Sequence, residues 1–211
     1  MNRPPPKPAA RAMLRNVDLF ALVNTALFAV MLAFVYYERF LRYRGRGNVH
    51  EFFIYAAAIA ALIALGWRYL RRFEFPTPLL AAVQAGILLH FAGAFVPVNG
   101  GRLYDAMLGP VRYDKVVHYS NALAAAAVVS RILTLLRAEL PLIRSLVVFL
   151  TVLGLGALVE ILEYAVLLTI PEAGVGGYDN NMHDLIANAG GALTFLAAGA
   201  ARRRRAAGAP A

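Results

Sequence analysis

The sequence predicts an all-α integral membrane protein, a bundle of six transmembrane helices with both termini in the cytoplasm. Of its 211 residues, 60% are hydrophobic and only 16% are charged, whereas roughly a quarter of the residues in a soluble domain are charged. The charged residues also gather in clusters. Between the clusters lie apolar runs of about twenty residues, the length that a helix needs to cross about 30 Å of hydrocarbon.

Prolines and basic residues mark the ends of the six apolar runs. The second run stops at Arg71 and Arg72. Pro76 and Pro78 precede the third run and Pro141 opens the fifth, and proline is favoured at a helix start because its missing N–H is not needed there. The expected spans cover residues 18–37, 51–70, 79–96, 116–136, 141–170 and 183–201.

The chain shows no internal repeat and no soluble domain, so residues 16–201 are expected to form one transmembrane domain. Residues 1–15 are basic and rich in proline, which is typical of a disordered tail rather than of a signal peptide. Residues 202–211 begin with four arginines and are expected to form a basic C-terminal tail. The sequence has no cysteine, which excludes disulfides and thiolate metal sites.

The distribution of Lys and Arg predicts the orientation. Six spans place both termini on one side of the membrane, together with the second and fourth loops. That side carries fourteen of the 21 Lys and Arg residues, and the other side carries seven, four of them between Arg39 and Arg46. Because cytoplasmic segments carry the excess of basic residues, the majority places both termini in the cytoplasm.

Polar residues of the fourth and fifth spans are expected in the outer half of this bundle. Asp114, His118 and Asn121 are spaced i, i+4, i+7, so they share one stripe at the outer end of the fourth span. Glu160 and Glu163 lie one turn apart on one face of the fifth span. Charged groups at membrane depth are unfavourable and are usually retained for a function.

The sixth and third spans bring further polar groups to the same depth. His183 and Asp184 open the sixth span, Asn188 follows one turn below, and Asp179 is expected in the preceding loop. The third span carries His90 about two turns before its end. Four helices are therefore expected to deliver acid, imidazole and amide groups to one region.

Each of these signals also has a structural interpretation. The two glutamates can be a buried pair retained for packing, and an Asp–His pair can cap a helix. The Asn and Asp residues between 179 and 184 are typical of a turn and a helix N-cap. His90 can be a satisfied core residue. The convergence of all the groups favours a functional site.

Three motifs resemble those of the YjdF-like bacterial inner-membrane proteins, which in turn resemble the VanZ-like proteins. These motifs are Tyr113-Asp114-Lys115-Val-Val-His118, then Glu160-x-x-Glu163, then Asp179 to Asp184 with Asn188 and Gly190-Gly191. The resemblance covers about residues 90–191. It implies a multi-pass protein of the bacterial inner (cytoplasmic) membrane and of the cell envelope, without a defined reaction. The VanZ-like members are associated with tolerance of the glycopeptide teicoplanin.

The first functional hypothesis is a hydrolase or transferase that acts on a lipid-linked or envelope substrate at the outer face. Carboxylates and imidazoles can act as general acid and base, or hold a divalent metal that activates water, and the cofactor is left open between these. The expected catalytic residues are His118, Glu160, Glu163, Asp114 and Asp184. Lys115 and Arg112 are expected to hold an anionic headgroup, and the other expected substrate-binding residues are Asn121, Asp179, Asn188, His90 and His183.

Two other hypotheses stay open. A proton- or cation-coupled transporter would use the same acids, but the chain lacks an inverted repeat and the inner parts of its last three spans are almost purely apolar. A non-catalytic envelope scaffold or binding protein is the third possibility. Membrane lipids are expected partners in every case. Nucleic acid is not expected despite a pI of 10.2, because the basic residues fit topology anchors rather than one binding surface.

Overall fold

The computed structural model describes residues 14–138, 143–169 and 177–208. Among these residues, six helices are long and apolar enough to cross a membrane, which confirms the predicted bundle. Pro141 and most of the expected N-terminal tail lie outside the described residues. The candidate spans are Asn16–Arg42, Arg46–Leu70, Thr77–Phe95, Tyr113–Leu135, Arg144–Ala165 and Tyr178–Ala207.

The first two spans form an antiparallel pair. Helix α1 (Asn16–Met31) continues through a π-helical segment, η1 (Leu32–Tyr36), into α2 (Tyr37–Arg44). A short 3₁₀ turn, η2 (Arg46–Asn48), leads into α3 (Val49–Leu70). The start of α1 is tied to the end of α3, because Asp18 accepts a hydrogen bond of 2.9 Å from Trp67 and pairs with Arg71 at 2.8 Å.

Helix α4 (Thr77–Phe95) leads into two small hairpins. Strand β1 (Pro97–Val98) pairs with β2 (Gly101–Arg102), and after a 3₁₀ turn, η3 (Leu103–Asp105), β3 (Met107–Leu108) pairs with β4 (Val111–Arg112). Asn99 and Gly100 connect the first pair with positive φ angles of 49° and 78°, the combination that favours Asn-Gly in a two-residue hairpin.

The last three helices are α5 (Tyr113–Leu135), α6 (Arg144–Thr169) and α7 (Tyr178–Ala207). Helix α7 begins five residues before the expected start of its span, so Asp179 lies in its first turn. The expectation that Asp179 belongs to a loop was wrong, because an acidic residue is also favoured by the positive end of a helix dipole. At its other end α7 continues through the four arginines from Arg202 to Arg205.

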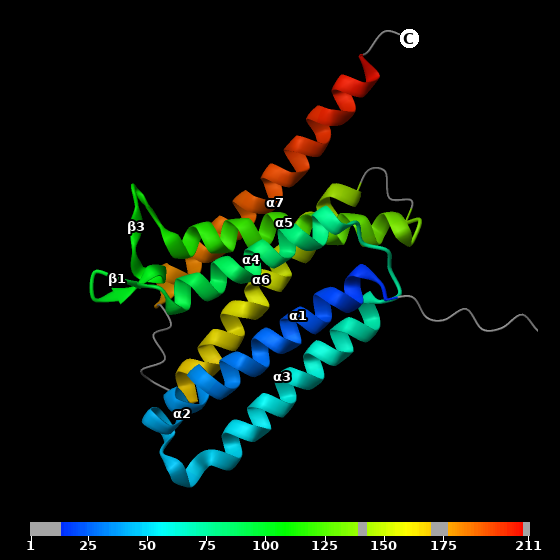
Figure 1. Cartoon of the computed structure of the whole chain (residues 1–211). Coiled ribbons are helices and arrows are strands. Elements are labelled where there is room, and N and C mark those ends of the chain that lie inside the picture. Colours follow the sequence, from blue (N-terminus) through cyan, green and yellow to red (C-terminus); the bar gives the residue numbers. More distant parts are fainter. Residues whose placement is uncertain (1–13, 139–142, 170–176, 209–211) are drawn as a thin grey trace, which may run out of the picture.

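Helix α5 is the centre of the packing. It packs most extensively on α7 and also on α4 and α6, while α6 packs on α7 (Figure 1). Helix α1 contacts α3 and α4, so α4 joins the N-terminal helices to the rest. The core between α5, α6 and α7 is built from small and branched residues: Ala122, Ala126, Val148, Val152 and Ala192.

Gly191 allows α5 and α7 to approach closely. A Cβ atom at this position would collide with the carbonyl oxygen of Tyr119 and would lie 3.0 Å from the backbone nitrogen of Leu123. One turn further along α7, Thr194 accepts a hydrogen bond of 2.8 Å from the Tyr119 hydroxyl. Such small-residue contacts drive helix association in lipid, where apolar burial contributes little.

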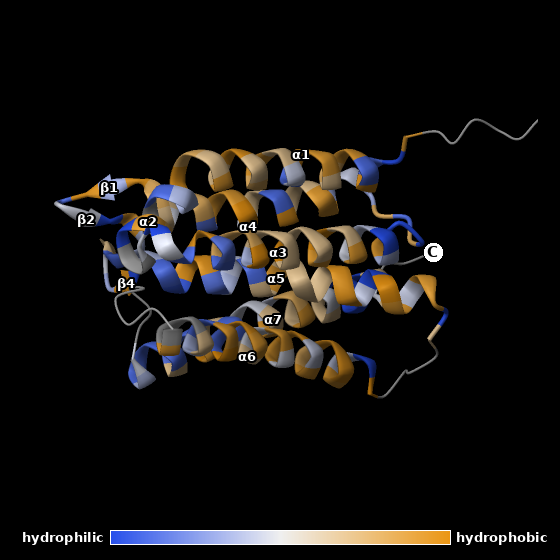
Figure 2. Ribbon diagram, turned by 90° about the horizontal axis from the view of Figure 1, so that it is seen from below, coloured by the Kyte–Doolittle hydropathy of each residue, from blue (hydrophilic) through white to orange (hydrophobic). Residues whose placement is uncertain are grey.

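Large apolar side chains cover much of the outer surface. Leu62 on α3 and Leu162 on α6 are 68% and 65% exposed, as expected for helices that face lipid. Hydrophilic residues are concentrated at the helix ends and near the hairpins, and apolar residues occupy most of the length between them (Figure 2). As a membrane protein of this kind, the chain contacts membrane lipids.

Candidate functional site

A cavity of about 590 Å³ lies near the hairpins, between α4, α5, α6 and α7. One part of its wall is polar and another part is apolar. The apolar part comes from α5 and α6 and consists of Val117, Ala122, Ala125, Val152, Leu155, Val159 and Leu162. The expected site residues that line the cavity are His90, Arg112, Asp114, His118, Asn121, Glu163, Asp184 and Asn188.

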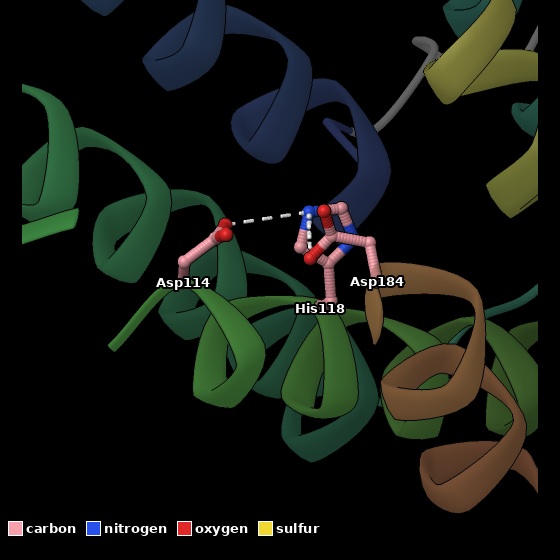
Figure 3. A group of neighbouring side chains, drawn as sticks. All are labelled: Asp114, His118 and Asp184. Carbon is pink, nitrogen blue, oxygen red and sulfur yellow. Dashed lines mark ion pairs between the residues drawn. The ribbon is translucent and has the colours of Figure 1, made fainter. Parts of the chain in front are cut away.

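Asp114, His118 and Asp184 form the centre of the polar part, and we call them the acid–imidazole centre. Nε2 of His118 lies 3.6 Å from Oδ1 of Asp114 and 3.4 Å from Oδ1 of Asp184 (Figure 3). The i, i+4 spacing places the first two on one face of α5, and α7 supplies the third. Both aspartates are buried, Asp184 to 1% exposure.

Lys115 joins the two aspartates. Its Nζ donates to Oδ2 of Asp114 at 2.9 Å and to Oδ1 of Asp184 at 2.6 Å. It also donates to the side-chain and backbone oxygens of Asn180, at 2.9 and 3.2 Å. Asn180 in turn donates from Nδ2 to Oδ2 of Asp184 at 2.7 Å. The ammonium expected to hold an anionic headgroup therefore connects α5 to the first turn of α7.

Arg112 lies at the edge of the cavity and contacts both a hairpin and α7. Its Nη2 donates to Asp105 at 2.8 Å and its Nη1 donates to Asn180 at 3.1 Å. Asp105 also pairs with Arg102, at 3.1 Å. The sequence reasoning missed Arg102, Asp105 and Asn180. Of these three residues, only Asn180 could have been identified from the sequence, because it lies one helical turn before Asp184 on the same face of the helix.

The two glutamates of α6 point toward the centre from the opposite side. Glu160 is 6% exposed, and its Oε1 lies 3.9 Å from Nδ1 of His118. Within the described residues, neither oxygen of Glu160 has a hydrogen-bond partner. Glu163 lines the cavity. A buried carboxylate without hydrogen bonds is strongly unfavourable unless a proton or a cation is close to it.

Two asparagines occupy space that glycines leave open. A Cβ atom at Gly156 on α6 would approach Nδ2 of Asn188 to 2.5 Å, and one at Gly86 on α4 would collide with Oδ1 of Asn121. Asn188 is buried, and both asparagines line the cavity. Their expected role in binding substrate stays a prediction.

His90 is held by an aromatic residue that the sequence analysis missed. Tyr104 of η3 shares a hydrogen bond with Nδ1 of His90, and their rings meet edge to face at 5.5 Å. Burial raises the pKa of the Tyr104 phenol above its usual range, and the negative charge of Asp114 raises it further. The phenol therefore stays neutral at physiological pH and can keep its hydrogen bond.

Asp179 and His183 are not brought into the site. Both side chains are exposed and neither lines the cavity, although both were expected to bind substrate. The reason is helical geometry: the buried face of α7 contains Asp184 and Asn188. Position 183 lies one residue before Asp184, about 100° around the helix, and position 179 lies five residues before Asp184, about 140° around it.

The arrangement offers acid, base and ligand groups beside an apolar wall. His118 has carboxylates facing both ring nitrogens, so it can exchange a proton and be stabilised as a cation. One ligand atom from each of Asp114, His118 and Asp184 lies within 4.8 Å of the others, so these residues could also hold a metal ion.

The fold and the cavity together define a six-span membrane protein with a buried Asp–His–Asp centre near its hairpins. The model of the predicted membrane protein family DUF2238 matches residues 20–205, and the chain belongs to this family. Neither the curated proteins nor the solved structures give a significant match to the chain.

Proposed function

We propose that the protein is an enzyme, a hydrolase or transferase, that acts on a lipid-linked substrate of the cell envelope. The observation that carries this proposal is that one cavity combines the acid–imidazole centre with an apolar wall from α5 and α6. A molecule with a polar headgroup on a hydrocarbon chain matches both parts. The substrate would place its reacting bond near His118 and its chain along the apolar wall.

His118 is the proposed general base. Its Nε2 would take a proton from water or from a substrate hydroxyl, and Asp114 and Asp184 would stabilise the resulting imidazolium. Glu160, near Nδ1, would orient the ring. Glu163 faces the cavity and is the proposed acid for the leaving group.

Arg112 is the proposed contact for an anionic headgroup. Its guanidinium lies at the edge of the cavity and pairs with Asp105, whose side chain is 45% exposed. A phosphate group, like this carboxylate, offers anionic oxygens that accept hydrogen bonds from a guanidinium. An anionic headgroup would therefore compete with Asp105 for Arg112.

The proposed location is the outer face of the bacterial inner membrane. The hairpins lie at the end of the bundle away from the C-terminus (Figure 2), and residues of the hairpin region line the cavity. The excess of basic residues on the side of the termini favours a cytoplasmic position for the termini. The resemblance of the three motifs to the YjdF-like and VanZ-like proteins supports a role in the envelope.

The packing of the helices favours an enzyme over a transporter. Toward the other end of α5, the space between α5, α6 and α7 is filled by an apolar cluster that includes Ala126, Val148 and Ala192. A proton or cation relay would need polar groups or water through this region. A non-catalytic binding protein would use the same cavity without turnover.

Turnover of envelope lipids tests the proposal. The full-length protein in nanodiscs would be incubated with a bacterial envelope lipid extract, and the loss of intact lipids and gain of headgroup products followed by mass spectrometry. We expect Glu160→Gln to abolish turnover. The control variant Glu74→Gln should retain turnover, because the Glu74 side chain is 84% exposed and lies at the opposite end of the bundle. Equal product formation by wild type and Glu160→Gln would contradict the proposal.

A further inference from the structure

We propose that Asp114, His118 and Asp184 bind a divalent cation, and that Glu160 holds the imidazole from behind. The binding is inferred from the geometry of these four side chains. Its catalytic use rests on the proposed function: with an ion on Nε2 of His118, the ion would activate the attacking water in place of the imidazole acting as general base. The two claims can therefore fail separately.

The distances in the acid–imidazole centre fit an ion between the side chains. Nε2 of His118 is 3.4 and 3.6 Å from one oxygen of each aspartate (Figure 3). A direct hydrogen bond would normally be about 2.7–3.2 Å long. Two ligand atoms that each lie about 2.1 Å from a tetrahedral zinc ion are about 3.4 Å apart. The 3.4 and 3.6 Å separations from Nε2 of His118 therefore match two ligands of one metal ion better than a direct hydrogen bond.

The orientation of the His118 ring also favours a cation. Nδ1 faces the carboxylate of Glu160, while Nε2 faces both aspartates. If Nδ1 carries its hydrogen toward Glu160, the lone pair of Nε2 points at two carboxylate oxygens. A metal ion at that point turns this repulsion into three bonds. Histidine ligands usually donate their other N–H to a carboxylate in this way.

Glu160 is an independent sign that a positive charge belongs here. It is 6% exposed, and both of its oxygens lack a hydrogen-bond partner among the described residues. Its closest ion-pair contact is Nδ1 of His118, at 3.9 Å. An ion bound to Nε2 would polarise the Nδ1–H group and draw it toward Glu160, which would satisfy the carboxylate.

Lys115 shares the aspartates with the proposed ion. Its Nζ bonds Oδ2 of Asp114, which leaves Oδ1 facing His118, and it bonds Oδ1 of Asp184. The cluster holds four acidic side chains, those of Asp114, Asp184, Glu160 and Glu163, against this one ammonium. Lys115 therefore organises the ligands and also weakens the binding of the ion through repulsion.

The ligand set selects the type of ion. One imidazole and two carboxylates, without sulfur, suit Zn²⁺ or Mn²⁺ better than Ca²⁺ or Mg²⁺, which prefer oxygen ligands alone. Three protein ligands leave a fourth position for water, as in catalytic zinc sites. The cavity lies next to that position, because all three residues line it.

Metal binding to the full-length protein in detergent tests this inference. The protein would be stripped with a chelator, dialysed, and titrated with ZnCl₂ or MnCl₂, with bound metal measured by mass spectrometry. We expect about one ion per chain. His118→Ala should lower the affinity at least a hundredfold and Glu160→Gln about tenfold to a hundredfold, whereas His50→Ala, which removes an exposed imidazole at the start of α3, should leave it unchanged.

The folded state of each variant would be checked by gel filtration, and Asp114→Asn serves as a second ligand variant if His118→Ala fails to fold. Wild-type protein that binds no stoichiometric ion, or ligand variants that bind as tightly as wild type, would overturn the inference. Ion binding without lipid turnover would refute the proposed function and retain the metal site. Turnover by wild-type protein that binds no stoichiometric ion when titrated would refute the metal site and retain the proposed function.

Discussion

Lys115 connects α5 to α7 through the carboxylates of Asp114 and Asp184, and its replacement by methionine is expected to destabilise the bundle. The side chains of Lys115 and Asp184 are 15% and 1% exposed, so solvent screens their 2.6 Å contact weakly. Removing one partner of a buried ion pair costs about 3–5 kcal/mol, because the other charge stays buried and unpaired.

A double-mutant cycle isolates this contact. Unfolding in detergent, followed by circular dichroism in the presence of a chelator, would be measured for Lys115→Met, Asp184→Asn and the double variant. We expect a coupling energy of about 2–3 kcal/mol, because the second change removes the charge that the first one leaves unpaired. The chelator is needed because Lys115→Met should also strengthen binding of the proposed ion.

An exposed pair provides the matched control. Arg102 and Asp105 lie 3.1 Å apart, but their side chains are 35% and 45% exposed, so their coupling should stay below about 1 kcal/mol. Equal coupling in the two cycles would refute the reasoning that burial makes the Lys115 contact strong. Additive effects of Lys115→Met and Asp184→Asn would show that the two side chains act independently.

Three further predictions follow from the fold. Gly191→Ala should destabilise the protein by about 1–3 kcal/mol, since the added Cβ collides with α5, whereas Gly154→Ala, whose Cβ meets nothing within 4 Å, should be neutral in the same unfolding assay. In the chain without cysteine, Met107→Cys in β3 should react with a membrane-impermeant maleimide added to intact cells; protection there, with labelling only after lysis, would reverse the proposed orientation. The Tyr104 phenol should ionise at higher pH than an ordinary tyrosine, detected as the difference in ultraviolet titration between wild type and Tyr104→Phe. Because folding raises the pKa of Tyr104, this residue does not affect stability below about pH 10. Above that pH stability falls, since the Tyr104 phenol loses its proton in the unfolded chain but keeps it in the folded protein. An identical titration of wild type and Tyr104→Phe would contradict the burial of Tyr104.

Sequence patterns were sufficient for the six spans and for one face of α5. Long apolar runs between clustered charges can form little else, and the spacing of Asp114, His118 and Asn121 places them on a shared stripe in any α-helix. The direction of the chain through the membrane also predicted that Glu160 lies at the same depth as Asp114 and His118. These are local rules, and the structure agrees with each of them.

The rest of the site depends on tertiary contacts that spacing does not determine. Asp179 and Asp184 are both acidic residues near the start of α7, but only the packing against α5 decides that Asp184 is buried and Asp179 is exposed. Strands of two residues carry no periodic signal. Asn99-Gly100 favours a hairpin turn, but this local signal does not show that the hairpin brings Arg102 and Tyr104 to the cavity. The bond from Lys115 to Asp184 spans 69 residues of sequence.

The position of the cavity explains why its charges are tolerated in a membrane protein. The four acids lie toward one end of the bundle, and the interior beyond them is apolar. Lys115 donates hydrogen bonds to Asp114 and Asp184, and Asn180 donates one to Asp184. Glu160, by contrast, has no hydrogen-bond partner among the described residues. This asymmetry separates the part of the cluster that holds the helices together from the part available for chemistry.

One comparison tests whether His118 is needed to convert a lipid-linked substrate in this cavity. The rate of headgroup release from envelope lipids would be measured in nanodiscs for wild type, His118→Ala and His50→Ala, at equal amounts of folded protein. We expect turnover by wild type and His50→Ala and a loss of at least a hundredfold in His118→Ala. Equal turnover by all three proteins, or none by wild type, would contradict this expectation.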